Sequence, residues 1–399
     1  MSDLQELLAA FDCGELLRPT HLAPNIVDLA RALANLADAE GIQPSHGSES
    51  VANIIGPADH LVFVLADGLG VEQVEALPEG AFLRRHLRAE LQTVFPSSTA
   101  PAVTSFVTGE WPARHGVTGW WTHIPSIGSA GAVLPFVART GRRSLTSLGV
   151  TPNDVFLQPP LLQSIRRDSL CVLPYQLAES VYSAYLSGGW PKQSYGSLRQ
   201  AADAVAARVA SAAAPTYTFV YTPLVDAAAH RYGALHDQTL KAIAEVNAEI
   251  ERLSAGLRGG RLVMSADHGL RDAPPGARRR IVPSSTVTAP LRFAPSGDAR
   301  VLFLHLGDGM QASDLEGLRH RTGNRFMMIS LDEAEELELF GPGQISPAVR
   351  ERMGDVIAIS RGRDVVSYDP DGMIRPIMAE ASQHSGLSPT EMTVPLVVA

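Results

Sequence analysis

Residues 61–67 read LVFVLAD, a short apolar run that ends in an aspartate. Two later segments follow the same pattern, TYTFVYTPLVD at 216–226 and RLVMSAD at 261–267. The apolar part of each segment is short, contains mainly Val, Leu, Met or aromatic residues, and lacks a clear apolar–polar alternation. These features predict strands that are buried on both faces of a parallel sheet.

Residues 236–257 lie between the second and third runs and predict an amphipathic helix. Its apolar residues recur every three or four positions, which marks one buried face: Leu240, Ile243, Val246, Ile250 and Leu253. A strand, a helix and a strand in this order imply a right-handed crossover in an α/β sheet. We therefore expect a three-layer α/β/α core with a largely parallel sheet.

Composition divides the remaining chain into three parts. Residues 1–50 predict an N-terminal leader with a helical stretch at 26–36 and a polar loop at 45–50. Residues 275–350 combine short strand-like runs with an acidic stretch and several prolines and glycines, which predicts a smaller, inserted α+β subdomain. The α/β core would then comprise 51–274 and 351–399, with residues 121–200 as loops or a lid near its functional site.

The bulk charge and the cysteine content narrow the class of protein. A net charge of −9 argues against a nucleic-acid platform, whereas a small anionic ligand needs only local positive potential, which metal ions can supply. Two cysteines, Cys13 and Cys171, indicate no disulfide framework. We expect no secretory signal and no membrane span, hence a cytoplasmic location, because no basic cluster precedes an apolar run and the apolar runs are strand-sized. The oligomeric state stays open.

An aspartate follows each of the three predicted strands: Asp67, Asp226 and Asp267. Ligands of open α/β sheets bind beyond the carboxyl ends of the strands. One such aspartate is often only a helix cap or a turn former. Three carboxylates at one sheet edge would repel each other unless cations lay between them.

Histidines occupy matched places next to these aspartates. His230 lies four residues after Asp226, on the same helical face, and His268 directly follows Asp267. His384 lies in a loop before the final apolar strand. A lone histidine is more often a surface or core residue, but the whole set favours a metal site. Carboxylate and imidazole ligands suit zinc first, and also manganese or iron.

Residues 95–115 read FPSSTAPAVTSFVTGEWPARH and supply a candidate nucleophile. A strand at 93–95 would enter a tight turn, with Thr99 as the N-cap of a helix and Pro101 in its first turn. The threonine hydroxyl would then lie beside free N–H groups that favour an anion. Thr99 could simply cap this helix, but metal coordination would also make its hydroxyl a competent nucleophile.

Together these motifs resemble the alkaline phosphatase superfamily, most closely its type I phosphodiesterase/nucleotide pyrophosphatase branch. That branch has a strand-end Asp, an F-P-T-x-T-x-P-N-type turn, T-G-x-x-P-x-x-H-G, D-x-x-x-H, D-H-G and a late H-G-G-like motif. The matching residues follow in the same order: Asp67; Phe95, Pro96, Thr99 and Pro101; Thr108, Gly109, Pro112, His115 and Gly116; Asp226 and His230; Asp267, His268 and Gly269; His384, Ser385 and Gly386.

The resemblance implies two metal ions, with zinc the first expectation, and a phosphothreonine intermediate on Thr99. One ion would be held by Asp226, His230 and His384. The other would be held by Asp67, Asp267 and His268, with Thr99 as a further ligand.

Two positions depart from the family pattern. Trp120 stands where the branch's diesterases carry an Asn that binds a phosphoryl oxygen, and Ala102 replaces the usual Asn after the proline. Thr118, Thr122 and His123 are nearby candidates for the missing contact. Trp120 and Trp121 could stack on a nucleobase or sugar, or could serve only in packing.

The first functional hypothesis is hydrolysis of phosphodiester or pyrophosphate bonds in small, nucleotide-type substrates. A phosphomonoesterase or a phosphonate hydrolase is the alternative, since the same metal site serves all of these reactions. A phosphomutase is less favoured, because mutases of this superfamily usually carry a serine nucleophile and a large second domain. A non-catalytic binding protein is disfavoured because no expected ligand position is lost.

Overall fold

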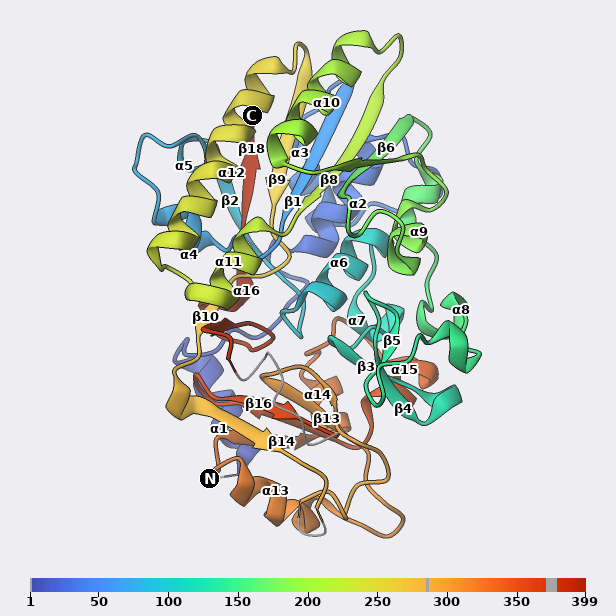
Figure 1. Ribbon diagram of the computed structural model, residues 1–399, viewed down its shortest axis with the longest axis vertical. Helices are drawn as coiled ribbons and strands as arrows, with labels where there is room; N and C mark the ends of the chain where they lie inside the picture. Colours follow the sequence, from blue (N-terminus) through green and yellow to red (C-terminus); the bar gives the residue numbers. More distant parts are fainter. Residues whose placement is uncertain (1, 285–286, 371–378) are drawn as a thin grey trace.

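The computed structural model describes residues 2–284, 287–370 and 379–399 (Figure 1). Its main sheet has seven strands in the order β2-β18-β9-β1-β8-β6-β7. β1 pairs in parallel with β8 on one side and with β9 on the other, and β18 is antiparallel to β9 and β2. The largely parallel sheet is therefore confirmed. Its strands are β1 His60–Ala66, β2 Leu87–Gln92, β6 Asp168–Pro174, β7 Lys192–Tyr195, β8 Thr216–Thr222, β9 Gly260–Ser265 and β18 Thr393–Val398.

Helices cover both faces of this sheet, as expected for three layers. In Figure 1 α10 and α12 cross in front of the sheet, and these two helices contact each other. α2, α3 and α6 form a second packed group, and Phe106 of α6 contacts Phe63 of β1 at 5.3 Å between ring centroids. The helices of the core are α2 Ile26–Leu36, α3 His46–Ile55, α4 Val71–Glu75, α5 Phe82–Arg85, α6 Thr99–Thr108, α7 Pro112–His115, α8 Pro152–Val155, α9 Val181–Ser187, α10 Leu198–Ser211, α11 Leu224–Tyr232, α12 Asp237–Gly256 and α16 Pro389–Met392.

The long crossover helix forms where its apolar spacing predicts it. α12 spans Asp237–Gly256, and the His236 side chain caps it by accepting a hydrogen bond from the Gln238 N–H. Ile243, Val246 and Ile250 are buried along its inner face. Burying such a stripe stabilises the helix more than local propensity does.

Two local predictions were wrong. The polar stretch 45–50 is the first part of α3, because the Ser45 and Ser48 side chains form a capping box and Val51 and Ile55 bury the inner face. The strand predicted at 93–95 is absent, since β2 ends at Gln92 and the segment from 93 to 98 bends at 95, 96 and 98 before α6 begins.

A second seven-stranded sheet, ordered β14-β15-β13-β12-β3-β4-β5, forms the other lobe. It reaches beyond the predicted subdomain at 275–350, because it also takes strands from 121–138 and 356–360. α1 of the predicted leader packs against β14 of this lobe, whereas α2 belongs to the core. Its elements are α1 Asp3–Asp12, β3 Trp121–Ile124, β4 Ser129–Ala132, β5 Val137–Ala138, β12 Ser296–Gly297, β13 Val301–Leu304, α13 Glu316–Arg321, β14 Phe326–Ser330, α14 Leu331–Glu336, α15 Pro347–Met353 and β15 Val356–Ser360.

Two short ladders and several 3-10 turns complete the structure. Antiparallel β10 and β17 join segments of the main lobe, and parallel β11 and β16 lie on the second lobe. No helix among the described residues has the length and hydrophobicity needed to cross a membrane. The bounds are β10 Arg271–Asp272, β11 Arg278–Ile281, β16 Val365–Tyr368 and β17 Ser382–Gln383, with 3-10 turns at Pro125–Ile127, Thr146–Leu148, Leu161–Ser164, Pro275–Ala277 and Ala312–Leu315.

A buried ion pair joins the two lobes. Arg300, in the turn between β12 and β13, lies 3.2 Å from Glu391 of α16, and both side chains are almost completely buried. Glu391 also accepts a hydrogen bond from the N–H of Gly386, and the Arg300 N–H donates to Ser385. The second lobe therefore helps to hold the loop that carries His384.

We predict that Arg300→Met lowers the free energy of unfolding by about 3–5 kcal/mol, because it leaves the Glu391 carboxylate buried without its partner. Urea denaturation measures this change. Arg292→Met is the matched control, since its ion pair with Asp308 is exposed and contributes about 1 kcal/mol or less. Equal effects of the two substitutions would contradict the prediction.

Candidate active site

The loops after three adjacent strands bring the predicted carboxylates together. Asp67 follows β1, Asp226 lies in the first turn of α11 after β8, and Asp267 follows β9. The N–H of Asp226 donates to the Asp67 carbonyl at 3.1 Å. The Gly68 N–H donates to Asp267 Oδ1 at 3.0 Å. Gly68 has a φ of 72°, and a Cβ there would lie 3.0 Å from Asp226, so a side chain at this position would crowd the site.

The three histidines lie over these carboxylates. His268 Nε2 is 3.4 Å from Asp67 Oδ1 and 3.5 Å from Asp267 Oδ2. His230 Nε2 is 3.2 Å from Asp226 Oδ1. The rings of His268 and His384 stack at 3.8 Å between centroids. The fold thus brings together all six residues that the sequence predicts as ligands.

Each histidine is oriented by a hydrogen bond at its other ring nitrogen. Nδ1 of His230 lies 2.9 Å from the Ser382 carbonyl, Nδ1 of His268 lies 2.9 Å from the Gly269 carbonyl, and Nδ1 of His384 lies 3.2 Å from the Ser97 carbonyl. A carbonyl at Nδ1 favours the tautomer that leaves Nε2 with a free lone pair. Metal-ligating histidines are typically held in this way.

Buried carboxylate oxygens in this cluster fit divalent cations. Asp67 Oδ1, Asp226 Oδ1 and Asp267 Oδ2 are buried and accept no hydrogen bond from a described residue. Two groups of donor atoms, each within 4.8 Å of one another, could hold an ion: Asp67, Asp267 and His268, and Asp226, His268 and His384. His268 is thus close to both groups, while His230 joins the second group through Asp226.

The electrostatics of the cluster favour a proton on Asp67 and on His230 where no cation is bound, and a cation would have to displace these protons. Burial raises the pKa of Asp67 well above its usual range, and the charges of Asp267 and Asp226 raise it further. Burial lowers the pKa of His384 well below its usual value, and the neighbouring His268 adds to this effect. Burial also opposes protonation of His230, but the Asp226 carboxylate outweighs it and raises the pKa of His230 to about 10. A bound cation would relieve the repulsion among the carboxylates.

Thr99 is the first residue of α6, whereas the sequence predicted it as the N-cap, one position before the helix. The N-cap is Ser98, whose hydroxyl donates to Asp298 Oδ2 at 2.6 Å instead of capping the helix. Thr99 Oγ1 lies 3.2 Å from His268 Nε2. A first turn leaves its N–H groups without intrahelical partners, and Pro101 has none, so Thr99 and Ala100 carry the donors beside this hydroxyl.

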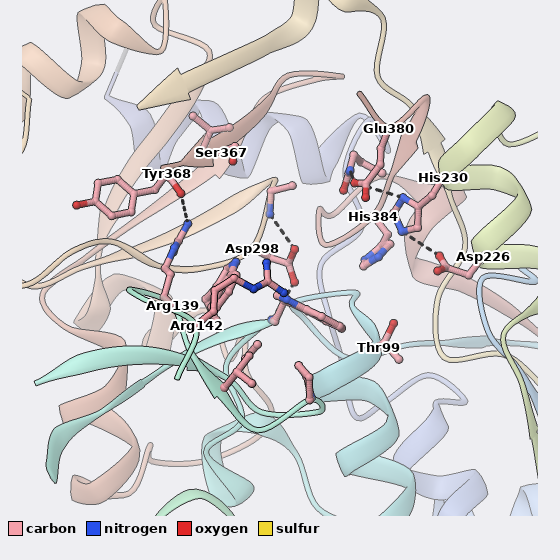
Figure 2. A pocket seen from close by; sticks show the side chains of 18 of the residues that line it. Thr99, Arg139, Arg142, Asp226, His230, Asp298, Ser367, Tyr368, Glu380 and His384 are labelled. Carbon is pink, nitrogen blue, oxygen red and sulfur yellow. Dashed lines mark hydrogen bonds and ion pairs between the residues drawn. The ribbon is translucent and has the colours of Figure 1, made fainter. Parts of the chain in front are cut away.

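A cavity of about 350 Å³ opens in front of Thr99, Asp226, His230 and His384 (Figure 2). Trp120 and Trp121 line it, as expected of substrate contacts. His123 does not line this cavity, because its ring is buried against Phe293 and His305 in the second lobe. Thr118 and Thr122 are buried away from the cavity as well.

Several residues of the site escaped the sequence analysis. Asp298 lines the cavity and also accepts the Trp120 N–H at 3.0 Å, although 178 residues separate them. Tyr221, the last aromatic residue of the second predicted strand run, donates its hydroxyl to Asp67. Glu380 lies 3.7 Å from His230. No local motif marks these residues, because their partners are distant in the chain.

Comparison with models of known protein families shows which family this chain belongs to. The model of the type I phosphodiesterase/nucleotide pyrophosphatase family matches residues 61–370. The chain belongs to this family. It is accordingly a hydrolase enzyme, and the predicted resemblance is confirmed. No curated protein matches the chain in sequence.

Solved structures share the fold. Mouse ectonucleotide pyrophosphatase/phosphodiesterase 5 has a TM-score of 0.62 at 14% identity, over 84% of this chain and 87% of its own. The human protein of the same name has a TM-score of 0.63 at 13% identity, over 85% and 87%. Phosphonoacetate hydrolase from Sinorhizobium meliloti, in complex with phosphonoformate, has a TM-score of 0.54 at 17% identity, over 86% and 90%.

We predict two divalent ions per folded chain, which inductively coupled plasma mass spectrometry of the purified protein measures. His384→Ala should lower the content toward one ion and activity by orders of magnitude, because it removes a donor from one group and leaves the other intact. His320→Ala, at an exposed position of α13, should keep both ions. Active protein with one ion or none would contradict a two-metal site.

Proposed function

We propose that this protein is a two-metal hydrolase of phosphodiester or pyrophosphate bonds in small, nucleotide-type substrates, with Thr99 as the nucleophile. The observation that carries the proposal is the position of the Thr99 hydroxyl. It lies at the start of a helix, lines the cavity, and is 3.2 Å from His268 Nε2, which is itself 3.4 Å and 3.5 Å from carboxylate oxygens of Asp67 and Asp267.

The ligands proposed for one ion are Asp67, Asp267 and His268, with Thr99 completing the set. Those proposed for the other are Asp226, His230 and His384. Zinc is the first candidate, because these ligands are carboxylate oxygens and imidazole nitrogens. When bound, such ions lower the pKa of a coordinated hydroxyl and stabilise charge on the phosphoryl oxygens.

The reaction we propose has two displacements at one phosphorus atom. Thr99 Oγ1 attacks phosphorus, the bond to the leaving oxygen breaks, and a phosphothreonine forms. Water then attacks the same phosphorus, which releases the phosphorylated product and restores the hydroxyl. The first-turn N–H groups of Thr99 and Ala100 are suited to bind a phosphoryl oxygen, since a helix N-terminus favours an anion.

Phosphonate hydrolysis is the second candidate, and the similarity of the fold to a phosphonoacetate hydrolase favours it. A phosphomonoesterase would use the same ligands. The small size of the predicted subdomain was one reason to disfavour a phosphomutase. The second lobe is larger than predicted, so this reason no longer applies. The family and the proposed threonine nucleophile still favour a hydrolase over a phosphomutase.

The wall of the cavity supports a substrate with a second substituent on phosphorus. Trp120, Trp121 and Tyr368 belong to the lining, and Pro135 and Val137 add apolar surface. A diester monoanion needs such room and apolar contact, whereas a monoester dianion needs a further cation at its additional oxygen, and the arginines of the lining lie across the cavity from Thr99 (Figure 2).

We predict that Thr99→Ala abolishes most turnover but leaves folding and metal content nearly unchanged, because Ser98 and not Thr99 is the N-cap. The loss of stability should stay below about 1 kcal/mol. Thr99→Ser keeps the hydroxyl and should retain appreciable activity. Rapid acid quenching followed by mass spectrometry should detect phosphate on Thr99. Wild-type rates in Thr99→Ala would instead indicate direct attack by water.

We also predict that diesters are hydrolysed faster than monoesters, as kcat/KM. Nitrophenyl thymidine monophosphate and nitrophenyl phosphate form the test pair, because they share a leaving group. A tenfold preference for the monoester, about 1.4 kcal/mol in transition-state binding, would identify a phosphatase instead.

A further inference from the structure

We propose that Arg142 binds a second anionic group of the substrate, a carboxylate or a phosphate, on the far side of the cavity from Thr99. This inference rests on the proposed function, because it assumes that the reacting phosphoryl or phosphonyl group lies at the metal ligands. It narrows the substrate class to small molecules with a negative charge beyond the bond that is cleaved.

The two sides of the cavity differ in charge. Asp226 and Glu380 line it beside the proposed ligands His230 and His384, Arg139 and Arg142 bring two guanidinium groups on the other side, and Asp298 lies between them (Figure 2). In Figure 2 the two arginines lie across the cavity from Asp226 and Thr99. A ligand that spans the cavity therefore meets cations at both ends once metal ions fill the carboxylate cluster.

Arg139 forms part of the cavity wall. Its guanidinium donates to the carbonyls of Pro295, at 2.7 Å, and Tyr368, at 3.0 Å. It also lies 4.9 Å from the ring centroid of Trp121 and 5.0 Å from that of Tyr368. Arg139 is buried, so it holds these two rings in place and contributes a fixed positive charge.

Arg142 also lines the cavity, but its side chain is not held by the protein. It is exposed, and its guanidinium makes no hydrogen bond or ion pair with any residue in the described part of the chain. The donors of an arginine match the two oxygens of a carboxylate or phosphate. A neutral sugar or base would leave them unused.

The backbone at Arg142 adds an independent observation. The turn after β5 is closed by a hydrogen bond from the Ala138 N–H to the Arg143 carbonyl at 2.8 Å. Gly141 and Arg142 both have left-handed backbones in this turn, with φ of 68° and 49°. This conformation favours glycine or asparagine and is unfavourable for arginine, so local structure does not explain why an arginine stands there.

The test measures binding without turnover. Isothermal titration calorimetry of zinc-loaded Thr99→Ala protein compares methylphosphonate, which has one anionic group, with phosphonoacetate and methylenediphosphonate, which have two. The comparison is repeated with Arg142→Asn added, a neutral residue that tolerates the left-handed backbone. Arg143→Asn is the matched control, because Arg143 is equally exposed but does not line the cavity.

We expect at least one of the two-anion probes to lose tenfold or more in affinity when Arg142 becomes Asn, while methylphosphonate changes by less than threefold. Arg143→Asn should leave all three affinities unchanged. The two-anion probes can also chelate the metal ions. The test therefore compares the affinity of each probe between the variants with and without Arg142→Asn, and not the affinities of different probes for one variant. A larger loss of affinity for phosphonoacetate indicates that Arg142 binds a carboxylate, and a larger loss for methylenediphosphonate indicates that it binds a phosphate.

The outcomes separate this inference from the proposed function. If methylphosphonate binds and both two-anion probes keep their affinity in Arg142→Asn, the inference about Arg142 is wrong and the proposed function stands. If no probe binds to any zinc-loaded variant, both are wrong. Thermal unfolding of Arg142→Asn should match or exceed that of the parent, because asparagine relieves the left-handed strain; this result shows that a loss of affinity is not a loss of fold.

Discussion

Repulsion among three buried carboxylates is the constraint on which the rest of this structure depends. Asp67, Asp226 and Asp267 follow neighbouring parallel strands, so the sheet itself sets their separation. Tyr221 and the backbone N–H of Gly68 donate hydrogen bonds to Asp67 and Asp267, yet the remaining buried oxygen of each of the three carboxylates faces a histidine Nε2, at 3.2–3.5 Å. A buried cluster of this kind is stable as anions only with cations between them. The surrounding histidines, held at Nδ1 by carbonyls, are suited to share those cations.

The two lobes have different tasks at the site. The parallel sheet places the proposed metal ligands and Thr99, as open α/β sheets place their ligands beyond the strand ends. The antiparallel lobe lines the other side of the cavity, through Trp121, Asp298 and the turn that carries Arg142, and would contact the proposed substrate. Asp298 connects the two lobes, because it accepts hydrogen bonds from Ser98, next to the proposed nucleophile, and from the N–H of Trp120. A change in the second lobe can therefore affect the position of the first turn of α6.

The sequence predicted those parts of the molecule whose signals are local. Buried strands that end in aspartate, an amphipathic helix of 20 residues and histidines at fixed spacing from the carboxylates all follow from short-range patterns. The failures share a different cause. His123 was a candidate because it lies close in sequence to the position of the missing Asn, but its ring lies against Phe293 and His305 of the second lobe, and these contacts join segments that are distant in the chain. The stretch at 45–50 looked like a loop because its polar residues are those that also cap a helix.

By itself, therefore, the sequence determined the sheet edge, the six proposed ligands and the proposed nucleophile, since each is set within a few residues of a strand or helix end. Only the tertiary structure decided what stands opposite them. Asp298, Arg139, Arg142 and Glu380 meet the site through contacts between segments far apart in the chain, and no spacing rule encodes such contacts. The second sheet is the clearest case, because strands from 121–138, 296–304, 326–330 and 356–360 pair only once the chain has folded back on itself.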